Sequence, residues 1–278
     1  MPKLNHLKSR LSQIKNIEKM TKVMEMIANA KIPQIKRQFE KSQQYFENLD
    51  YIFQQLIANL EEKDEIFLPS PSQQKLFIIF TSNLGFCGAF NNATIKTLKN
   101  DYQKGDKIIV FGKKGRIALD KYASDIIAQY INYEERNFEQ PILQVASIIS
   151  DAIVNKKYSK IKICFTHFIN IITSVAQVLD IYPLKKSQEI KTDLAMEFEP
   201  DAQQVLTKML PFYTQALLTK SFIESKLSEL SSRRVAMDSA TDNAVEIIEK
   251  LELELNSSRQ TVITQEIIEI IGANLEIS

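Results

Sequence analysis

Residues 212 to 271 read FYTQALLTKSFIESKLSELSSRRVAMDSATDNAVEIIEKLELELNSSRQTVITQEIIEII, with neither glycine nor proline. As a single helix these sixty residues would span about 90 Å at about 1.5 Å per residue, far more than a usual globular helix. Mostly apolar residues recur at alternating steps of three and four from Ile223. The positions reached are Leu227, Leu230, Arg234, Met237, Thr241, Ala244, Ile248, Leu251, Leu255, Ser258 and Val262. This repeat predicts a left-handed coiled coil.

The N-terminal stretch, residues 3 to 60, has the same repeat. The positions, stepped from Leu4, are Leu7, Leu11, Ile14, Glu18, Thr21, Glu25, Ala28, Ile32, Ile35, Phe39, Ser42, Phe46, Leu49, Phe53, Leu56 and Leu60. Pro33 removes the hydrogen bond to the Asn29 carbonyl, so we expect a kink there. The two stretches are predicted to be the two halves of one antiparallel coil.

The sequence between these arms has a different pattern. Short β-branched runs at 76–80, 107–111, 125–131 and 160–169 are separated by stretches long enough for one helix each, which is typical of a parallel, doubly wound α/β domain. A fifth run at 174–184 follows too closely for a crossover and should pair antiparallel, and polar residues 185–202 read as a linker. We therefore predict a coiled-coil helix at 1–68, an inserted Rossmann-like α/β domain with linker at 69–202, and a second coiled-coil helix at 203–278.

Composition is that of an ordinary globular protein. The chain has 278 residues, 44% of them hydrophobic and 25% charged, and a net charge of +1, which lacks the basic signature of a nucleic-acid-binding protein. Cys87 and Cys164 match no metal-ligand spacing and indicate a reducing compartment. The N-terminus has neither the apolar core of a signal peptide nor the features of a transit peptide, and no run is long enough for a membrane span.

Charge is distributed unevenly along the two arms. Residues 1–41 carry a net charge of +7, and residues 245–278 carry −5. A basic helix alone is compatible with a nucleic-acid or calmodulin-type ligand. Complementary flanks on one coil are the simpler interpretation, which we favour.

A second apolar stripe begins where the N-terminal seam turns polar. Ile17, Met20, Met24 and Ile27 lie one residue out of phase with Glu18, Thr21 and Glu25. A coiled-coil stutter can produce such a stripe. The alternative is that another protein encloses these turns, which fits the use of methionine at adaptable contacts.

The glycine turns lack the chemistry of a nucleotide site. TSNLGFCGAFNN (81–92) has only G-x-x-G spacing and no Walker lysine, and the third glycine of a dinucleotide fingerprint is missing. FGKKGR (111–116) opens a helix after a strand and has two lysines, so phosphate binding at this turn remains an alternative. His6 and His167 have no nucleophile or acid at motif spacing, which favours structural roles.

Three segments resemble the gamma subunit of the rotary ATP synthase. They are IKNIEKMTKVMEMIANAK (14–31), TSNLGFCGAFN (81–91) and the stretch from SSRRVAMDSATDN (231–243) to EIIGA (269–273). The resemblance covers nearly the whole chain, and it departs from the family pattern at Asn83-Leu84, where Asp-Arg is usual, and at Asn29 and Pro33. It implies a shaft that turns inside a hexamer of alpha and beta subunits, with the α/β domain on the membrane c-ring and the epsilon subunit.

The resemblance also implies roles for individual residues. Met20 and Met24 would face the moving lobe of a beta subunit, with Arg234 nearby. The alternative for Arg234, from its seam position, is an ion pair with Glu25. The other implied partner contacts are Arg259, Gln260, Thr264 and Glu266. The chain itself would be non-catalytic and would bind no nucleotide, cofactor, metal or nucleic acid. It would work at the cytoplasmic face of a bacterial inner membrane, coupling proton flow to ATP synthesis or hydrolysis.

Two rival interpretations remain at this stage, an α/β enzyme with a coiled-coil dimerisation arm and a stand-alone coiled-coil scaffold. The register of the coil is a further prediction, because pairing residues whose numbers sum to about 262 aligns both seams, including Thr21 with Thr241. Beyond Ser258 the second helix would then have no mate. Its apolar tip, at Val262, Ile263, Ile267 and Ile270, would need another cover.

Overall fold

A computed structural model describes residues 2–60, 67, 70–131, 137–184, 199 and 201–275, without the side chains of residues 2, 3, 266 and 269–275. The chain divides into two compact units. Unit 1 comprises Met1–Ala28 and Arg233–Ser278, and unit 2 comprises Asn29–Ser232. The two long helices contribute to both units, and each unit is described by itself.

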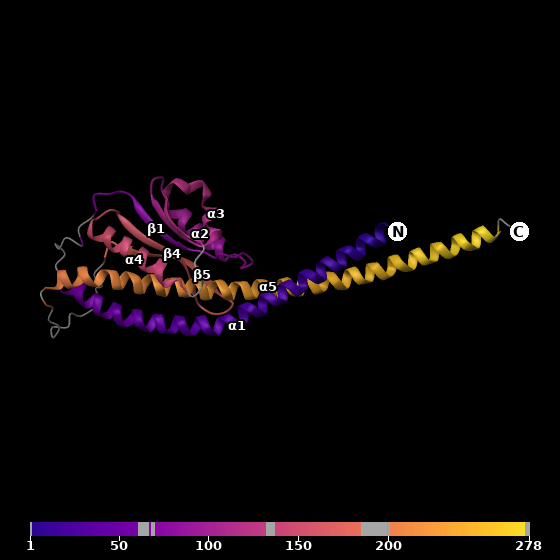
Figure 1. Ribbon diagram of the computed structural model, residues 1–278, viewed down its shortest axis with the longest axis horizontal. Helices are drawn as coiled ribbons and strands as arrows, with labels where there is room; N and C mark the ends of the chain where they lie inside the picture. The colour runs from indigo at the N-terminus through magenta and orange to yellow at the C-terminus, as the bar shows by residue number, and fades with distance from the viewer. Residues whose placement is uncertain are drawn as a thin grey trace. The chain divides into compact units, whose positions relative to one another are not determined.

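The elements follow the alternation that the sequence predicts. In chain order they are α1 (Pro2–Ala58), β1 (Lys75–Phe80), α2 (Phe90–Asp101), β2 (Lys107–Phe111), α3 (Lys113–Ala118), the 3-10 helix η2 (Asp120–Asp125), β3 (Ile126–Tyr130), α4 (Glu139–Val154), β4 (Lys160–Phe168), β5 (Ser174–Tyr182) and α5 (Ala202–Leu275). The predicted linker lies mostly outside the described residues. The ribbon is shown in Figure 1.

The five strands form one mixed sheet in the order β3-β2-β1-β4-β5. β1 pairs in parallel with β2 and with β4, and β2 pairs in parallel with β3. β5 pairs antiparallel with β4, with Phe168 opposite Ser174 at the hairpin end. The prediction of four parallel strands and an antiparallel fifth is confirmed.

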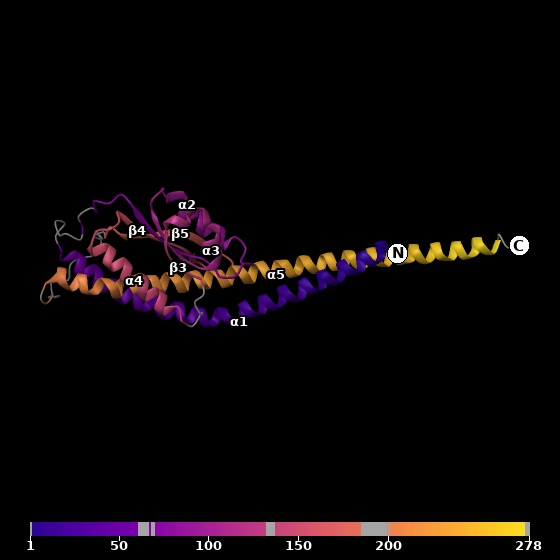
Figure 2. The ribbon, with the colours of Figure 1, turned by 45° about the horizontal axis from the view of Figure 1, so that its top comes forward.

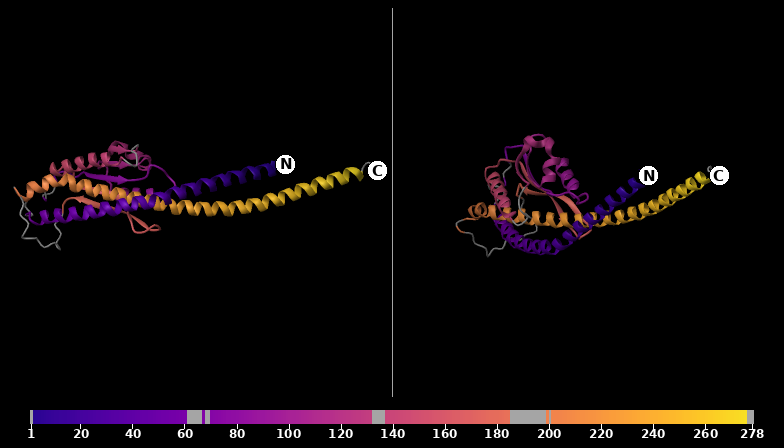
Figure 3. Two further views of the ribbon diagram at one scale, coloured as in Figure 1. Left: turned by 60° about the horizontal axis from the view of Figure 1, so that its bottom comes forward. Right: turned by 45° about the vertical axis from the view of Figure 1, so that its right-hand side comes forward.

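The central strand β1 is buried on both faces, and its side chains alternate between them. Phe77 and Ile79 pack against Ile95 and Leu98 of α2. Leu76, Ile78 and Phe80 belong to a larger core on the other face, which α4, α1 and α5 cover. This layering of α2 and α3 on one side and α4 on the other is visible in Figures 2 and 3.

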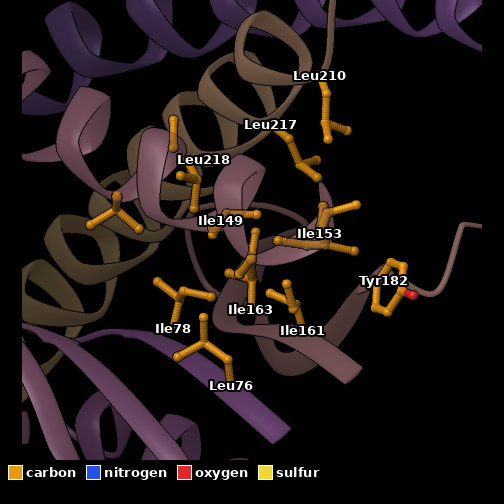
Figure 4. Close-up of a cluster of buried hydrophobic side chains, with 14 of the residues drawn as sticks. Leu76, Ile78, Ile149, Ile153, Ile161, Ile163, Tyr182, Leu210, Leu217 and Leu218 are labelled. Carbon is orange, nitrogen blue, oxygen red and sulfur yellow. The ribbon is translucent and has the colours of Figure 1, made fainter. Parts of the chain in front are cut away.

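The larger core joins the sheet to the long helices of unit 2. Figure 4 shows Ile149 and Ile153 of α4 between the strand residues Ile161 and Ile163 and the α5 residues further along the chain. In the same unit Phe53 of α1 stacks on Tyr213 of α5 at 3.8 Å between ring centroids. Because Tyr213 Oη also donates a 3.0 Å hydrogen bond to Asp50, this level of the helix pair is fixed by both apolar and polar contacts.

The helix pair has the predicted periodicity. Each seam position in residues 4–60 and 223–262 is buried or half-buried, and none of them is exposed. Pro33 lies inside α1, and the two units divide α1 between Ala28 and Asn29, four residues before Pro33. The kink itself stays a prediction. The fold is an α/β domain inserted, along the chain, between the two helices of an antiparallel coil.

Candidate functional site

The seam of unit 1 pairs the first part of α1 with the last part of α5. The Thr241 hydroxyl donates a 2.8 Å hydrogen bond to the Thr21 hydroxyl, and both side chains are buried. Lys15 forms a 2.7 Å ion pair with Glu252, which links the basic flank of α1 to the acidic flank of α5. The predicted pairing of Thr21 with Thr241 is confirmed, and with it the register of the coil in this unit.

Buried polar groups interrupt the seam at this level. Glu25 is buried and forms a 2.9 Å ion pair with Lys22, one turn earlier on α1. The hydrogen bond and charge of Glu25 raise the pKa of Lys22. The structure establishes Lys22 as one partner of Glu25. The Glu25–Arg234 pair inferred from the sequence stays a prediction.

Two neighbouring arginines occupy different positions on α5. Arg233 is buried, whereas Arg234, which the sequence placed on the seam, is half-buried. From Leu230 a step of three followed by a step of four passes through Arg233, and the reverse order passes through Arg234. Both orders reach Met237, so periodicity alone did not single out Arg233.

The off-seam stripe of α1 is an exposed apolar surface. We call it the α1 stripe and define it as Ile17, Met20, Val23, Met26 and Ile27, each about half exposed. Met24 is half-buried. Ile17, Met20 and Ile27 belong to the predicted pattern, and Val23 and Met26 extend it. Apolar residues that are grouped on a surface mark an interaction site, whereas single exposed apolar residues are common on any protein.

The last turns of α5 present a second group of predicted contacts. Arg259, Gln260 and Thr264 are exposed in unit 1, and the side chain of Glu266 lies outside the described residues. Leu4 and Leu7 of α1 border the same cavity as Ser258 and Val262, so the N-terminal end of α1 is level with these residues. Of the predicted uncovered tip, Ile263 and Ile267 are exposed and Val262 is half-buried, whereas the side chain of Ile270 lies outside the described residues. Ile268, which was not predicted, is also exposed.

All of the described contact residues therefore fall in one unit. Met20, Met24 and Arg234 lie near the polar part of the seam, and Arg259, Gln260 and Thr264 lie near the end of α5. Met20, Arg259, Gln260 and Thr264 are exposed, and Met24 and Arg234 are half-buried, so apolar and polar side chains are accessible along this helix pair. Such a surface can bind another protein, and it contains no arrangement of nucleophile, acid and base.

In the glycine turn at 111–116, three backbone amides donate to protein groups. The amide of Lys113 donates to Asn83 Oδ1 at 3.0 Å, that of Lys114 to the Ser82 carbonyl at 3.0 Å, and that of Gly115 to Thr81 Oγ1 at 3.0 Å. A phosphate at this turn would have to displace all three contacts. Asn83, where the sequence departs from the family pattern, therefore makes a polar contact in this loop with its amide oxygen as the acceptor.

Gly112 explains why this turn is tight. Its φ is 96°, and a Cβ there would lie 2.2 Å from the Thr81 carbonyl oxygen, so only glycine fits. Cys87 is buried in the neighbouring turn, with its Sγ 3.1 Å from Asn91 Nδ2. These glycines and polar side chains build the junction between two strand ends, as the structural interpretation of the sequence expected.

His167 has a structural setting. Its Nδ1 contacts the buried carboxylate of Glu224 on α5, which also accepts a 3.2 Å hydrogen bond from the Phe168 amide. Within the described ranges no three His, Cys, Asp or Glu side chains are grouped as a metal site would need. Among the same residues, no helix is long and apolar enough to cross a bilayer.

Comparison with known proteins identifies the family. A family model described as ATP synthase matches residues 3–274. The ATP synthase gamma chain of Mycoplasmopsis pulmonis is 32% identical over 289 residues, covering 99% of this chain and 100% of that protein. That of Mycoplasma mobile is 34% identical over 290 residues, with 100% of both chains covered, and that of Rickettsia typhi is 34% identical over 283 residues, with 98% of both chains covered.

Solved structures show the same fold. A chain of the rotor of the Euglena gracilis mitochondrial ATP synthase superposes with a TM-score of 0.72 at 18% identity, covering 94% of this chain and 99% of that chain. A chain from the central stalk and c-ring of the Tetrahymena thermophila mitochondrial ATP synthase gives a TM-score of 0.64 at 19% identity, covering 80% and 99%. From its sequence relatives and its fold together, the chain belongs to the ATP synthase gamma chain family.

Proposed function

We propose that this chain is the central rotor shaft of a rotary ATP synthase. It couples proton flow through the membrane sector to ATP synthesis or hydrolysis at a hexamer of alpha and beta subunits. Membership of the gamma chain family supports this role. The observation in the chain itself that supports it best is the α1 stripe, a half-exposed apolar surface beside a polar seam.

The chain acts mechanically and contributes no catalytic group. Because one flank of unit 1 is apolar and others are charged, rotation presents different surfaces to each beta subunit in turn. A surface that contacts one conformation better than another shifts the equilibrium between them. The hexamer thereby passes through its states in order as the shaft turns.

The magnitude of this effect is adequate. Moving a two-state equilibrium from 1:99 to 99:1 takes about 5.5 kcal/mol of differential binding. Full burial of one Ile, Val or Met is worth about 1.5–3 kcal/mol, so enclosing five half-exposed side chains is worth about 4–8 kcal/mol. The stripe alone can therefore supply a coupling free energy of the required size.

The proposed partners are the alpha and beta subunits, the epsilon subunit and the membrane c-ring. Met20, Met24 and Arg234 contact the beta subunits, and Arg259, Gln260, Thr264 and Glu266 contact the hexamer near the end of α5. The α/β domain, residues 69–202, contacts the ring and epsilon, and the helices at 1–68 and 203–278 form the shaft. The chain is peripheral at the cytoplasmic face of the bacterial inner membrane and binds no nucleotide or nucleic acid.

Co-purification tests the role as a whole. A tagged copy of the chain, expressed in its native host, should bring down a complex with ATP hydrolysis activity and with alpha and beta subunits. An enzyme with a dimerisation arm would instead be recovered alone with its cofactor, and a scaffold would be recovered only with itself. Either result would refute the proposal.

A matched pair of substitutions tests the α1 stripe. Met20→Lys places a charge on the stripe, and Leu143→Lys places the same charge on the exposed face of α4, where the side chain is 55% exposed against 57% for Met20. In assembled complexes we expect Met20→Lys to lower proton pumping per ATP hydrolysed, and Leu143→Lys to leave that ratio unchanged. Equal losses of pumping and hydrolysis in Met20→Lys, or failure to assemble, would give the stripe a structural role only.

A further inference from the structure

The outer layer of the α/β domain carries a group of exposed lysines. α2, α3 and η2 cover one face of the sheet, on the side away from the long helices of unit 2 (Figure 2). None of the exposed lysines in these elements and their loops forms an ion pair with another residue that the structure describes. We call this surface the basic face and define it by six residues, Lys96, Lys99, Lys104, Lys113, Lys114 and Lys121.

The four acids within residues 90–125 do not offset the basic face, because protein groups already bind each of them. Asp106 is buried and accepts two backbone amides at 2.8 Å. The other three form ion pairs, Asp101 with Lys75 and Lys162, Asp120 with Arg116, and Asp125 with Lys107. The net charge of +4 on residues 90–125 is therefore carried mainly by the exposed lysines.

The helix on the opposite side of the sheet has the opposite charge. α4 contains Glu139 and Asp151 and neither lysine nor arginine, which gives it a net charge of −2. Both acids are exposed. A negatively charged surface would therefore attract the basic face and repel the α4 side of the same domain.

Exposed apolar side chains lie among the lysines at one end of the basic face. The loop before α2 borders the start of α3, because the amides of Lys113 and Lys114 bond to it. The side chain of Lys114 lies beside Gly85, since a Cβ on that glycine would be 3.3 Å from Lys114 Cε. The apolar side chains around this lysine are each more than half exposed, and they are Leu84, Phe86 and Ile117.

From these features we infer that the basic face binds an anionic lipid surface. Lysines attract phosphate headgroups, and neighbouring apolar side chains can enter the boundary between headgroups and acyl chains. The long stem of Lys114 can lie along that apolar group while its ammonium stays at the headgroups. The inference concerns the free chain and does not depend on the proposed function.

Other polyanions fit the basic face less well. Arginine, with its planar fork of donors, is the residue that suits nucleic-acid phosphates best. The single arginine of residues 90–125, Arg116, is already bonded to Asp120 and Gln129. A folded acidic protein would have to match six dispersed charges, whereas mobile lipid headgroups can adjust to them. Neither alternative gives a role to the exposed apolar side chains.

The basic flank of α1 is a weaker candidate for the same ligand. Residues 1–41 carry a net charge of +7, but the coil places the acidic flank of α5 beside them, as the 2.7 Å ion pair between Lys15 and Glu252 shows. Part of the charge on α1 is therefore neutralised within unit 1. This flank serves as the control in the charge experiment below.

Sedimentation with vesicles tests the inference on the purified full chain. The vesicles are phosphatidylcholine alone, or phosphatidylcholine with about 40% phosphatidylglycerol, which is anionic. We expect binding to the anionic vesicles and none to the neutral ones. Binding should weaken at least about tenfold when the salt is raised from about 50 to about 500 mM, because the Debye length shortens.

Two triple variants locate the charge that is responsible. One neutralises the basic face and carries Lys96→Gln, Lys99→Gln and Lys121→Gln. The other removes the same charge from exposed positions of α1 and carries Lys8→Gln, Lys19→Gln and Lys36→Gln. The first should bind anionic vesicles about 100-fold more weakly, at about fivefold for each lysine. The second should stay within about threefold of the parent, because only long-range attraction is reduced.

Tryptophan fluorescence tests whether the apolar group enters the lipid. The chain contains no tryptophan, so a single introduced indole reports only on its own surroundings. Phe86→Trp places it in the apolar group, and Leu143→Trp places it on α4, where the side chain is 55% exposed against 63% for Phe86. Anionic vesicles should shift the emission of Phe86→Trp to shorter wavelength and leave that of Leu143→Trp unchanged.

The opposing outcomes are distinct. No sedimentation with anionic vesicles at low salt would overturn the lipid surface as a ligand. Equal weakening in the two triple variants, or equal emission shifts in the two tryptophan variants, would overturn the basic face as its location. Tighter binding to a DNA duplex than to the vesicles would overturn the choice of lipid. All of these measurements use the free chain, so their failure is separate from failure of the co-purification that tests the proposed function.

Discussion

The hydrogen bond between Thr21 and Thr241 offers a direct energetic test of the coil register in unit 1. Thr241 donates to Thr21 at 2.8 Å, and each hydroxyl also lies within hydrogen-bond distance of a carbonyl of its own helix, Glu18 for Thr21 and Met237 for Thr241. Replacement by valine keeps the shape and the helix propensity and removes only the hydroxyl.

The cost of each single change follows from what remains. A buried hydroxyl that loses its partner costs about 1–3 kcal/mol, and because the local carbonyl remains available we expect the low end, about 1 kcal/mol. With both hydroxyls replaced, no polar group is left unsatisfied at the seam. The double variant should then lose no more than about 1 kcal/mol in total, which gives a coupling energy of about 1 kcal/mol.

Guanidinium denaturation of the four chains, followed by circular dichroism, measures these differences. Thr261→Val is the matched control, because Thr261 is exposed on α5 and makes the same bond to a carbonyl four residues earlier. Its effect should stay within about 0.5 kcal/mol. Strictly additive losses in the double variant, or single variants as mild as the control, would mean that the two threonines do not face each other.

Two predictions concern unit 2. Asn83→Ala should cost about 0.5–1.5 kcal/mol through loss of the hydrogen bond from the Lys113 amide at the start of α3, whereas Asn83→Asp keeps an acceptor and should be nearly neutral; equal losses in denaturation would show that this hydrogen bond is unimportant. Burial raises the pKa of Asp101, but hydrogen bonds from Lys162 and Lys75 outweigh it and hold that pKa below its ordinary value, so this carboxylate stabilises the fold above about pH 4. That contribution is lost as the pH falls through the lowered pKa, so the stability deficit of Asp101→Asn should be largest near pH 7 and should shrink below pH 4; a deficit independent of pH would contradict this linkage.

Periodicity was sufficient for the fold because its signals are long. A 3.5-residue repeat sustained over more than ten steps on each arm is compatible with few structures other than a coil. The alternation of short β-branched runs with helix-length gaps similarly identified the parallel sheet, and the short gap before Ser174 identified the antiparallel strand. Register could be predicted because polar seam residues, Thr21 and Thr241, had to coincide.

Single side chains were harder to place, because their surroundings come from distant parts of the chain. Arg233 and Arg234 are indistinguishable by spacing, and only the phase of α5 decides which is buried. Glu224 lies in the predicted helical stretch without a partner at helical spacing that the sequence singles out, and its partners, His167 and the Phe168 amide, come from a strand more than fifty residues earlier. The basic face could not be predicted either, because its lysines are interspersed with four acids and only the fold determines which charges are exposed.

The same residues that weaken the seam of unit 1 lead to a last prediction. Thr21 and Glu25 occupy seam positions that are apolar elsewhere, and the apolar side chains at this level lie on the exposed α1 stripe instead. This part of α1 therefore buries less apolar surface than the Phe53 to Ile57 turn of unit 2. Segments with few buried apolar contacts open more easily. In the isolated chain, amides of residues 17–27 should therefore exchange hydrogen faster than those of residues 53–57.

Enclosure by partner subunits should slow hydrogen exchange at the α1 stripe. If the α1 stripe is covered in the assembled complex, the amides of residues 17–27 should slow by about tenfold or more, which corresponds to about 1.4 kcal/mol of local stabilisation. The exposed outer turn around Leu143 serves as an internal reference, because its exchange should not change on assembly. Hydrogen exchange with mass spectrometry on the free chain and on the complex measures both segments at once. Equal protection of residues 17–27 in the two samples would show that the stripe remains exposed to water in the assembly, and the apolar bearing would then have to lie elsewhere on the shaft.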